Sequence, residues 1–145
     1  MRLIVQRVTS ASVKVEGSVV GQIKNGLLVL VGVKKADTER DAEALAEKLS
    51  KLRVMADKEG KMNLSVKDVD AEVLVVSQFT LYADTTGGNR PSFIDAALPE
   101  DARKVYERFI AKLKELELSV ETGSFGDYMQ IKTELDGPVT IIIES

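Results

Sequence analysis

The chain has 145 residues, of which 44% are hydrophobic and 30% charged, and its formal net charge is −3. These values are typical of one soluble globular domain over residues 1–145, and they offer no general electrostatic argument for binding nucleic acid. The sequence contains no Cys and no His, which excludes the Ser-His-Asp triad, cysteine nucleophiles, histidine bases and almost every zinc site. We therefore expect neither a metal nor a cofactor.

The N-terminal apolar run is interrupted at Gln6 and Arg7, which is too early for a signal peptide. No apolar run in the sequence approaches the length that crosses a membrane. The sequence therefore predicts a cytoplasmic protein with no membrane partner.

Four strands are predicted before the first helix. The second of them alternates, with Val13 and Val15 on one face and polar residues on the other. Asn25-Gly26 is typical of a hairpin turn and precedes an unbroken apolar run, which predicts a strand buried on both faces. The four predicted strands cover residues 3–8, 12–16, 19–23 and 27–33.

Two amphipathic helices are predicted. The first begins at residues 37–39, where carboxylates lie at the positive end of the helix dipole, and the second begins near Pro99. In each helix the apolar residues recur at spacings of three and four, which is one buried stripe. The stripes are Ala42, Leu45, Ala46, Leu49 and Leu52 in the first helix, and Ala102, Val105, Tyr106, Phe109, Ile110 and Leu113 in the second.

A fifth strand is predicted over residues 73–76, and polar side chains follow it directly. Ser77, Gln78 and Thr80 come next, with Phe79 among them. Hydroxyl and amide groups at the end of a core strand must find partners, either in neighbouring loops or in a ligand. The pattern is compatible with an ordinary strand end and with a binding site.

The C-terminal part begins with a Gly-rich connector over residues 84–91. Its Arg90 has two readings, a phosphate contact or a clamp for the connector. By itself Gly137-Pro138 predicts a hairpin turn between the last two strands. The last three predicted strands cover residues 118–121, 128–133 and 139–143.

Together these elements predict a mixed α/β fold in the order β-β-β-β-α-β-α-β-β-β. The expected architecture is a two-layered, barrel-like sheet core with both helices packed on one side. Two helices cover only one side of the apolar strands, which include Ile141-Ile142-Ile143. We expect a second sheet layer or a second copy of the chain to cover the rest.

Six motifs occur along the chain. They are Gln6-Arg7-Val8, Ser77-Gln78-Phe79-Thr80, Arg90-Pro91-Ser92-Phe93, Thr122-Gly123 with Phe125-Gly126, Met129, and Gly137-Pro138-Val139-Thr140. In their residues and their order, from end to end and without insertions, they resemble D-aminoacyl-tRNA deacylases, the D-tyrosyl-tRNA deacylase family.

The resemblance implies a homodimer with shared active sites that hydrolyses the ester joining a D-amino acid to the 3′-terminal adenosine of tRNA. It also implies activity on tRNA wrongly charged with glycine. The implied catalytic residues are Ser77, Gln78 and Thr80. The implied substrate-binding residues are Phe79 and Met129, a cis Gly137-Pro138 from the partner subunit, and Arg7 as its brace.

The chain departs from the family at two positions. Leu135 stands where the family usually has Asn, which puts in question how the Gly-Pro segment is held. Asp127 stands where the family often has Ala. We expect neither change to abolish activity.

The resemblance implies that the Gly137-Pro138 backbone excludes L-amino acids from the site, and this role has a physical logic. L- and D-aminoacyl esters carry the same groups, and one methylene changes binding by only about 1–3 kcal/mol. Rejection of the L form therefore needs a rigid obstacle where its side chain would point. Backbone at Gly137-Pro138 would serve, since it has no rotamers.

Thr80 has two possible roles. As a nucleophile it needs a base, and without His only a Lys of lowered pKa or a carboxylate could activate it. Alternatively, the ribose 2′-hydroxyl assists attack by water, while the protein orients the ester and stabilises the oxyanion.

Three functions therefore stay open. They are a dimeric editing hydrolase, an esterase with Thr80 as nucleophile, and a non-catalytic RNA-binding or editing accessory module. The aromatic content of 5% argues against a module that binds single strands by stacking bases.

Overall fold

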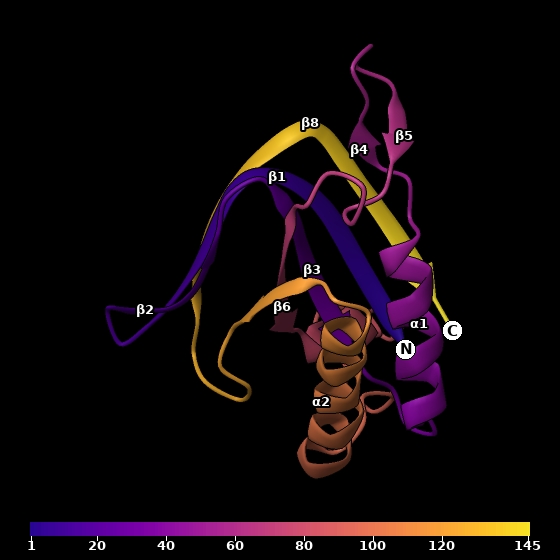
Figure 1. Cartoon of the computed structure of the whole chain (residues 1–145). Helices are drawn as coiled ribbons and strands as arrows, with labels where there is room; N and C mark the ends of the chain where they lie inside the picture. Colours follow the sequence, from indigo (N-terminus) through magenta and orange to yellow (C-terminus); the bar gives the residue numbers. More distant parts are fainter.

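The computed structural model describes residues 1–145 as strands and helices around one strongly bent sheet (Figure 1). The elements in chain order are β1 (Arg2–Val15), β2 (Ser18–Ile23), β3 (Gly26–Gly32), α1 (Glu39–Ser50), β4 (Met55–Ala56), β5 (Met62–Leu64), β6 (Glu72–Ser77), the 3₁₀ helix η1 (Phe79–Tyr82), α2 (Pro99–Glu115), β7 (Ser119–Thr122) and β8 (Gln130–Glu144). The main sheet has the order β2-β1-β3-β6-β7, and β8 pairs with β1. The expected mixed α/β class is confirmed, since β3, β6 and β7 are parallel and the other pairs antiparallel.

The long strand β1 organises the sheet. It pairs with β8 over nearly its whole length, and with β3 and then β2 along its other side. Gly26 lies opposite Val8 and Ile23 lies opposite Ala11, so β2 and β3 follow each other along β1. The expectation of a hairpin at Asn25-Gly26 was therefore wrong. At Lys24 and Asn25 the chain instead bends and bonds to Glu72 of β6.

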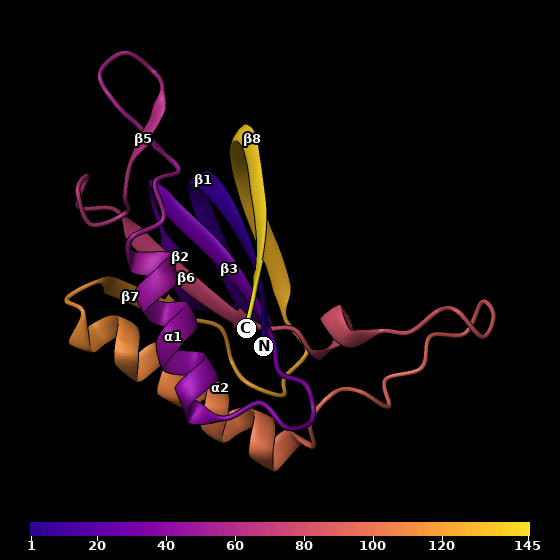
Figure 2. The same cartoon turned by 90° about the vertical axis from the view of Figure 1, so that its right-hand side faces the viewer.

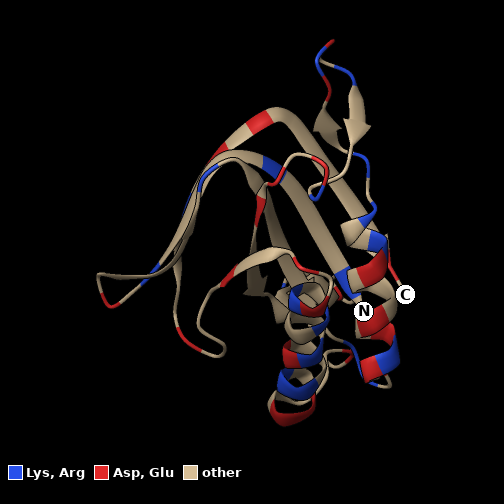
Figure 3. Ribbon diagram, viewed as in Figure 1, with Lys and Arg blue, Asp and Glu red and all other residues tan.

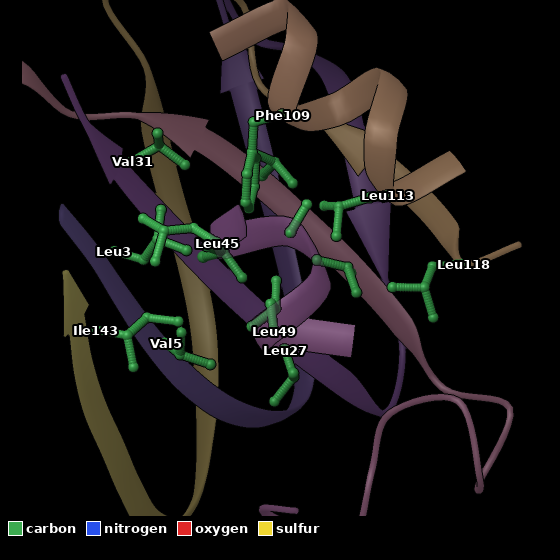
Figure 4. Close-up of a cluster of buried hydrophobic side chains, with 14 of the residues drawn as sticks. Leu3, Val5, Leu27, Val31, Leu45, Leu49, Phe109, Leu113, Leu118 and Ile143 are labelled. Carbon is green, nitrogen blue, oxygen red and sulfur yellow. The ribbon is translucent and has the colours of Figure 1, made fainter. Parts of the chain in front are cut away.

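Both helices pack on one side of the sheet, as expected (Figure 2). They share a core of 23 buried residues with one face of β1, β3 and β6. Figure 4 shows how Leu45 and Leu49 of α1 and Phe109 and Leu113 of α2 lie over Leu3, Val5, Leu27 and Val31 of the sheet. Each fully buried Leu or Phe side chain contributes about 1.5–3 kcal/mol to folding, so this core is the main stabilising element.

The opposite face of β3 and β6 is covered by the sheet itself. Leu28, Leu74 and Val76 form a second cluster with Val13 and Ile23, because the far half of β1 and β2 folds back over them. A second sheet layer therefore supplies the cover that the apolar strands require. The run Ile141–Ile143 is not covered on both faces, since Ile143 is buried and Ile142 is 62% exposed.

Two pairs of predicted strands are single strands in the structure. Residues 3–8 and 12–16 join in β1, and residues 128–133 and 139–143 join in β8. Leu135 pairs with Val8 and Thr140 with Gln6, so residues 136–139 lie opposite Arg7 alone. This bulge interrupts the alternation of side chains in both strands, which is why the pattern indicated a break. Gly137-Pro138 therefore lies in a bulge and not in the expected hairpin turn.

Charged residues of both signs are interspersed along α1 and α2 (Figure 3). Some pair between the helices, as Arg108 does with Glu43 at 2.7 Å and Lys112 with Glu47 at 3.2 Å. Neither helix is long and apolar enough to cross a membrane.

Candidate active site

The polar residues that follow β6 do not continue the strand. Ser77 is the last residue of β6 and pairs with Val31 of β3. The backbone N–H of Gln78 donates to the Val31 carbonyl at 2.7 Å. The chain then turns into η1, closed by bonds from the Leu81 amide to the Gln78 carbonyl (3.2 Å) and from the Ala83 amide to the Thr80 carbonyl (3.1 Å). Phe79 and Thr80 therefore project from a short helical turn at the edge of the sheet.

The side chains of Gln78 and Thr80 are partners. Gln78 Nε2 donates to Thr80 Oγ1 at 2.5 Å, and the Thr80 side chain is exposed to solvent. A neutral amide nitrogen has no lone pair with which to accept a proton, so Gln78 orients the hydroxyl without making it a stronger nucleophile.

A cavity of about 590 Å³ opens beside Ser77 and Gln78. Its wall is mainly apolar and includes the aromatic rings of Phe79, Phe93 and Phe125. Phe79 and Phe93 meet edge to face, with ring centroids 5.1 Å apart. A cavity of this size and lining fits a nucleoside-sized group with a few polar contacts.

Four of the predicted site residues line this cavity: Ser77, Gln78, Phe79 and Met129. Thr80 does not line the cavity, but its hydroxyl is hydrogen-bonded to the side chain of Gln78, which does.

Phe125, to which the sequence assigned no separate role, contacts two residues of α2. Its ring centroid lies 5.5 Å from that of Tyr106, and the Arg103 guanidinium lies 4.8 Å from it. The Tyr106 hydroxyl donates to the Val75 carbonyl at 3.0 Å. Burial raises the pKa of Tyr106 above its ordinary value, so the hydroxyl keeps its proton and its bond. The Thr-Gly-x-Phe-Gly spacing was the signal that could have identified Phe125 as a lining residue.

Met129 reaches the cavity because position 123 is glycine. A β-carbon at Gly123 would lie 2.7 Å from the Met129 sulfur and 3.5 Å from a Val76 methyl group. The absence of a side chain at Gly123 thus lets Met129 fold over the end of β6.

Only one charged residue lines the cavity. This is Asp127, whose carboxylate accepts a hydrogen bond from the Ser124 hydroxyl. No group of three or more potential metal ligands is present in the chain. The cavity lining therefore offers apolar contacts, hydrogen-bonding groups and a single carboxylate. Arg90, the ambiguous cation of the connector, is exposed and forms no ion pair.

The remaining predicted residues, Arg7, Gly137 and Pro138, form a second cluster at the bulge. Arg7 Nη1 donates to the Val54 carbonyl at 2.8 Å, and Arg7 Nε lies 2.8 Å from the Asp136 carboxylate. A β-carbon built at Gly137 would lie 3.3 Å from Arg7 Nη2. Gly137 has φ +118°, and its peptide bond to Pro138 is cis.

Within one chain the two clusters lie apart. Arg7 pairs with Leu27 of β3, whereas Gln78 bonds to Val31, four residues further along the same strand. Four strand residues span about 13 Å. A single copy of the chain thus does not bring Gly137-Pro138 into the cavity beside Gln78.

Residues 4–144 match the protein family described as D-Tyr-tRNA(Tyr) deacylase. The chain belongs to this family. It is 57% identical to the D-aminoacyl-tRNA deacylase of Thermotoga petrophila, across 100% of this chain and 97% of the relative. It is 53% identical to that of Brevibacillus brevis, across 100% of both chains. The family that the motifs indicated is thereby confirmed.

Two solved structures are similar to the chain. One, titled c-Myc DNA Unwinding Element Binding Protein, has a TM-score of 0.93 at 42% identity and covers 100% of this chain and 99% of its own. The other, a probable eukaryotic D-amino acid tRNA deacylase, has a TM-score of 0.82 at 16% identity and covers 99% and 98%. At that identity the second likeness concerns the fold alone.

Proposed function

We propose that the chain is an editing hydrolase that removes D-amino acids from the 3′-terminal adenosine of tRNA, and that two copies together build each active site. The coarse activity follows from family membership: the chain is a D-aminoacyl-tRNA deacylase, which hydrolyses an ester bond. The finer proposals concern the dimer, the cause of the selectivity for D- over L-aminoacyl-tRNA, the way in which water attacks the ester, and glycyl-tRNA as a further substrate. Because the substrate is charged tRNA, the proposed place of action is the cytoplasm.

The observation that carries this proposal is the full-length family match joined to the cavity beside Ser77 and Gln78. An adenosine fits the size and apolar lining of that cavity. In this pose the ester lies near the polar edge formed by Ser77, Gln78 and η1. The absence of Lys and Arg from the lining suits the base and ribose better than a phosphate.

Two features support a symmetric dimer. Strand β8 pairs only with β1, so its other edge is unpaired over 15 residues. The faces of β8 also present the exposed apolar side chains of Ile131, Leu135 and Ile142. Long exposed edge strands are normally covered, because they pair readily with other chains. In addition, a second copy is the simplest way to bring Gly137-Pro138 to the cavity.

In the proposed dimer the bulge of one copy stands over the cavity of the other and blocks the face to which an L side chain would point. Arg7 fixes this bulge from below through its contacts with Asp136 and Val54. Leu135 stands where the family usually has Asn, but the neighbouring Asp136 forms an ion pair with Arg7. This ion pair would keep the bulge in place without the Asn side chain. A smaller glycyl group has no side chain to reject and would be accepted.

Water is the proposed nucleophile, assisted by the 2′-hydroxyl of the terminal adenosine. The only side-chain partner of Thr80 is the Gln78 amide, which is no base. The role left to Gln78 and Thr80 is to orient the ester, and backbone N–H groups near η1 can stabilise the developing oxyanion.

Three substrates test the proposal in one assay: a D-aminoacyl-tRNA, the same tRNA ending in 2′-deoxyadenosine, and a simple D-amino acid ethyl ester. We expect rapid release of the amino acid only from the first. Equal rates on the first two would exclude assistance by the 2′-hydroxyl, and rapid turnover of the simple ester would favour an esterase with Thr80 as nucleophile. Binding of tRNA without any release would favour an accessory module.

A further inference from the structure

The 3₁₀ helix η1 ends at a carbonyl group that its own backbone does not satisfy. If the turn continued, the Leu81 carbonyl would accept from the Asp84 amide, but that amide donates to the Ser92 carbonyl at 2.8 Å. Four-residue 3₁₀ helices have few internal bonds, so the conformation of η1 depends on what its end contacts.

Arg2, the first residue of β1, supplies the missing donor. Arg2 Nη1 donates to the Leu81 carbonyl at 2.6 Å, and the guanidinium lies 5.0 Å from the centroid of the Tyr82 ring. Arg2 Nε forms an ion pair with Glu144 of β8, which fixes the guanidinium from the other side. Charge-assisted hydrogen bonds and cation–π contacts are among the stronger polar interactions at a protein surface.

The strand next to Arg2 is shaped to receive η1. Gly32 of β3 pairs with Arg2, and a β-carbon there would lie 3.0 Å from Leu81 Cβ and 3.1 Å from the Tyr82 ring. The turn therefore rests directly on the Gly32 backbone. Burial raises the pKa of Tyr82 to about 12, so its ring stays neutral over the working pH range.

We propose that Arg2 is a positioning residue, which clamps the C-terminal end of η1 and so fixes Gln78 and Thr80 for the ester hydrolysis. This inference rests on the proposed function for its kinetic part. Arg2 does not line the cavity and acts only through η1. Because most of the cavity wall comes from other elements, a looser η1 should leave substrate binding nearly intact and impair orientation at the reacting bond.

The test compares Arg2→Met with Arg108→Met. Arg108 lies on α2, is equally engaged through Glu43 and Glu115, and has no contact with η1, so it is a matched control. For Arg2→Met we expect kcat on D-aminoacyl-tRNA to fall about tenfold, with KM within about twofold of the parent. Hydrogen exchange should accelerate at the Leu81 and Ala83 amides and stay unchanged in β3. Arg108→Met should match the parent in kcat and in exchange at η1.

Arg2→Lys keeps a cationic donor at the same position, so its kcat should lie between those of the parent and Arg2→Met. If Arg2→Met does not fold, Arg2→Lys alone carries the test, with a smaller fall in kcat and faster exchange at Leu81 and Ala83.

The inference would be overturned by unchanged exchange at η1, by an unchanged kcat, or by exchange that accelerates equally throughout β1 and β3, which would indicate a merely structural role. Were the parent itself inactive on D-aminoacyl-tRNA, the proposed function would fail, while hydrogen exchange would still test the clamp.

Discussion

The hydroxyl of Thr80 and the amide of Gln78 face each other at 2.5 Å, and no carboxylate or lysine takes the place of the amide. A threonine without a base is a poor nucleophile, although it can orient a water molecule or the ester. At the scale of single residues, the hydrogen-bond partner of Thr80 thus decides its role: beside the Gln78 amide, the hydroxyl can orient a group but is not activated as a nucleophile.

We expect Thr80→Ala to lower kcat by no more than about tenfold, because it removes one hydrogen bond and no bond-forming atom. Loss of a true nucleophile costs about 10⁶-fold in kcat. Single-turnover kinetics on D-aminoacyl-tRNA would distinguish these values. Trapping of an acyl group on Thr80 of the parent would contradict the assignment.

At the scale of elements, the sequence predicted both helices and the buried strands because these have regular periodicity over many residues. It divided β1 and β8 wrongly, since residues 136–139 lie opposite Arg7 and shift the alternation in both strands. It also missed η1, which is set by contacts of Leu81 and Tyr82 with Gly32 and Arg2 that are remote in sequence.

The start of α1 provides a pH-dependent prediction. The Asp41 carboxylate accepts bonds from the backbone amide and the hydroxyl of Thr38, both at 2.8 Å, and these bonds lower the pKa of Asp41 to about 2. A folded pKa below the unfolded value means that the stabilisation is complete above about pH 4 and is lost as the pH falls through about 2. Asp41→Asn should therefore lower the free energy of unfolding by about 1 kcal/mol at pH 7, and by much less near pH 2.

Urea unfolding at the two pH values measures this difference. Glu39→Gln is the control, since it removes an acid from the same turn without affecting a bond to Thr38, and it should cost no more than about 0.5 kcal/mol. An equal cost of Asp41→Asn at both pH values would contradict the role of the ionised carboxylate.

Two glycines, one in β2 and one directly after β7, should respond differently to alanine. A β-carbon at Gly21 of β2 would collide with the backbone carbonyl of Thr122, which cannot move without shifting β7. At Gly123 the obstacle is the flexible end of Met129. We expect Gly21→Ala to lower the free energy of unfolding by about 3 kcal/mol or more, and Gly123→Ala by about 1 kcal/mol.

Besides its smaller effect on stability, Gly123→Ala should raise KM for D-aminoacyl-tRNA, because the new methyl group pushes Met129 toward the cavity. Chemical unfolding together with steady-state kinetics on both variants checks this contrast. The account of the cavity wall would be wrong if Gly123→Ala left KM unchanged.

At the scale of the whole molecule, the sequence motifs predicted a set of site residues but not how these residues are distributed over the structure. Ser77, Gln78, Phe79 and Met129 meet at one cavity, while Arg7 and Gly137-Pro138 lie at the bulge. Patterns along one chain contain no information on which copy supplies which residue, so the proposal of a shared site rests on the family resemblance. Phe93 and Phe125 were not recognised as lining residues although both belong to motifs of the sequence, because an aromatic side chain in such a motif can pack in a core as well as line a cavity.

Mixing two impaired variants tests the shared site. Gln78→Ala damages the cavity side and Arg7→Ala damages the bulge side, so each homodimer should have two impaired sites. After joint refolding of equal amounts, half of the dimers are mixed and each contains one intact site, so activity should rise above the mean of the separate variants, by up to about a quarter of the parent activity. Activity that stays at the level of the separate variants would show that Arg7 and Gln78 serve a site within one copy.

The most direct measurement of the central claim is the rate at which the purified chain releases amino acid from D-tyrosyl-tRNA compared with L-tyrosyl-tRNA at equal concentration. The account predicts rapid release of D-tyrosine, whereas L-tyrosyl-tRNA decays no faster than it does without the protein. Equal release from both substrates, or none from either, would contradict it.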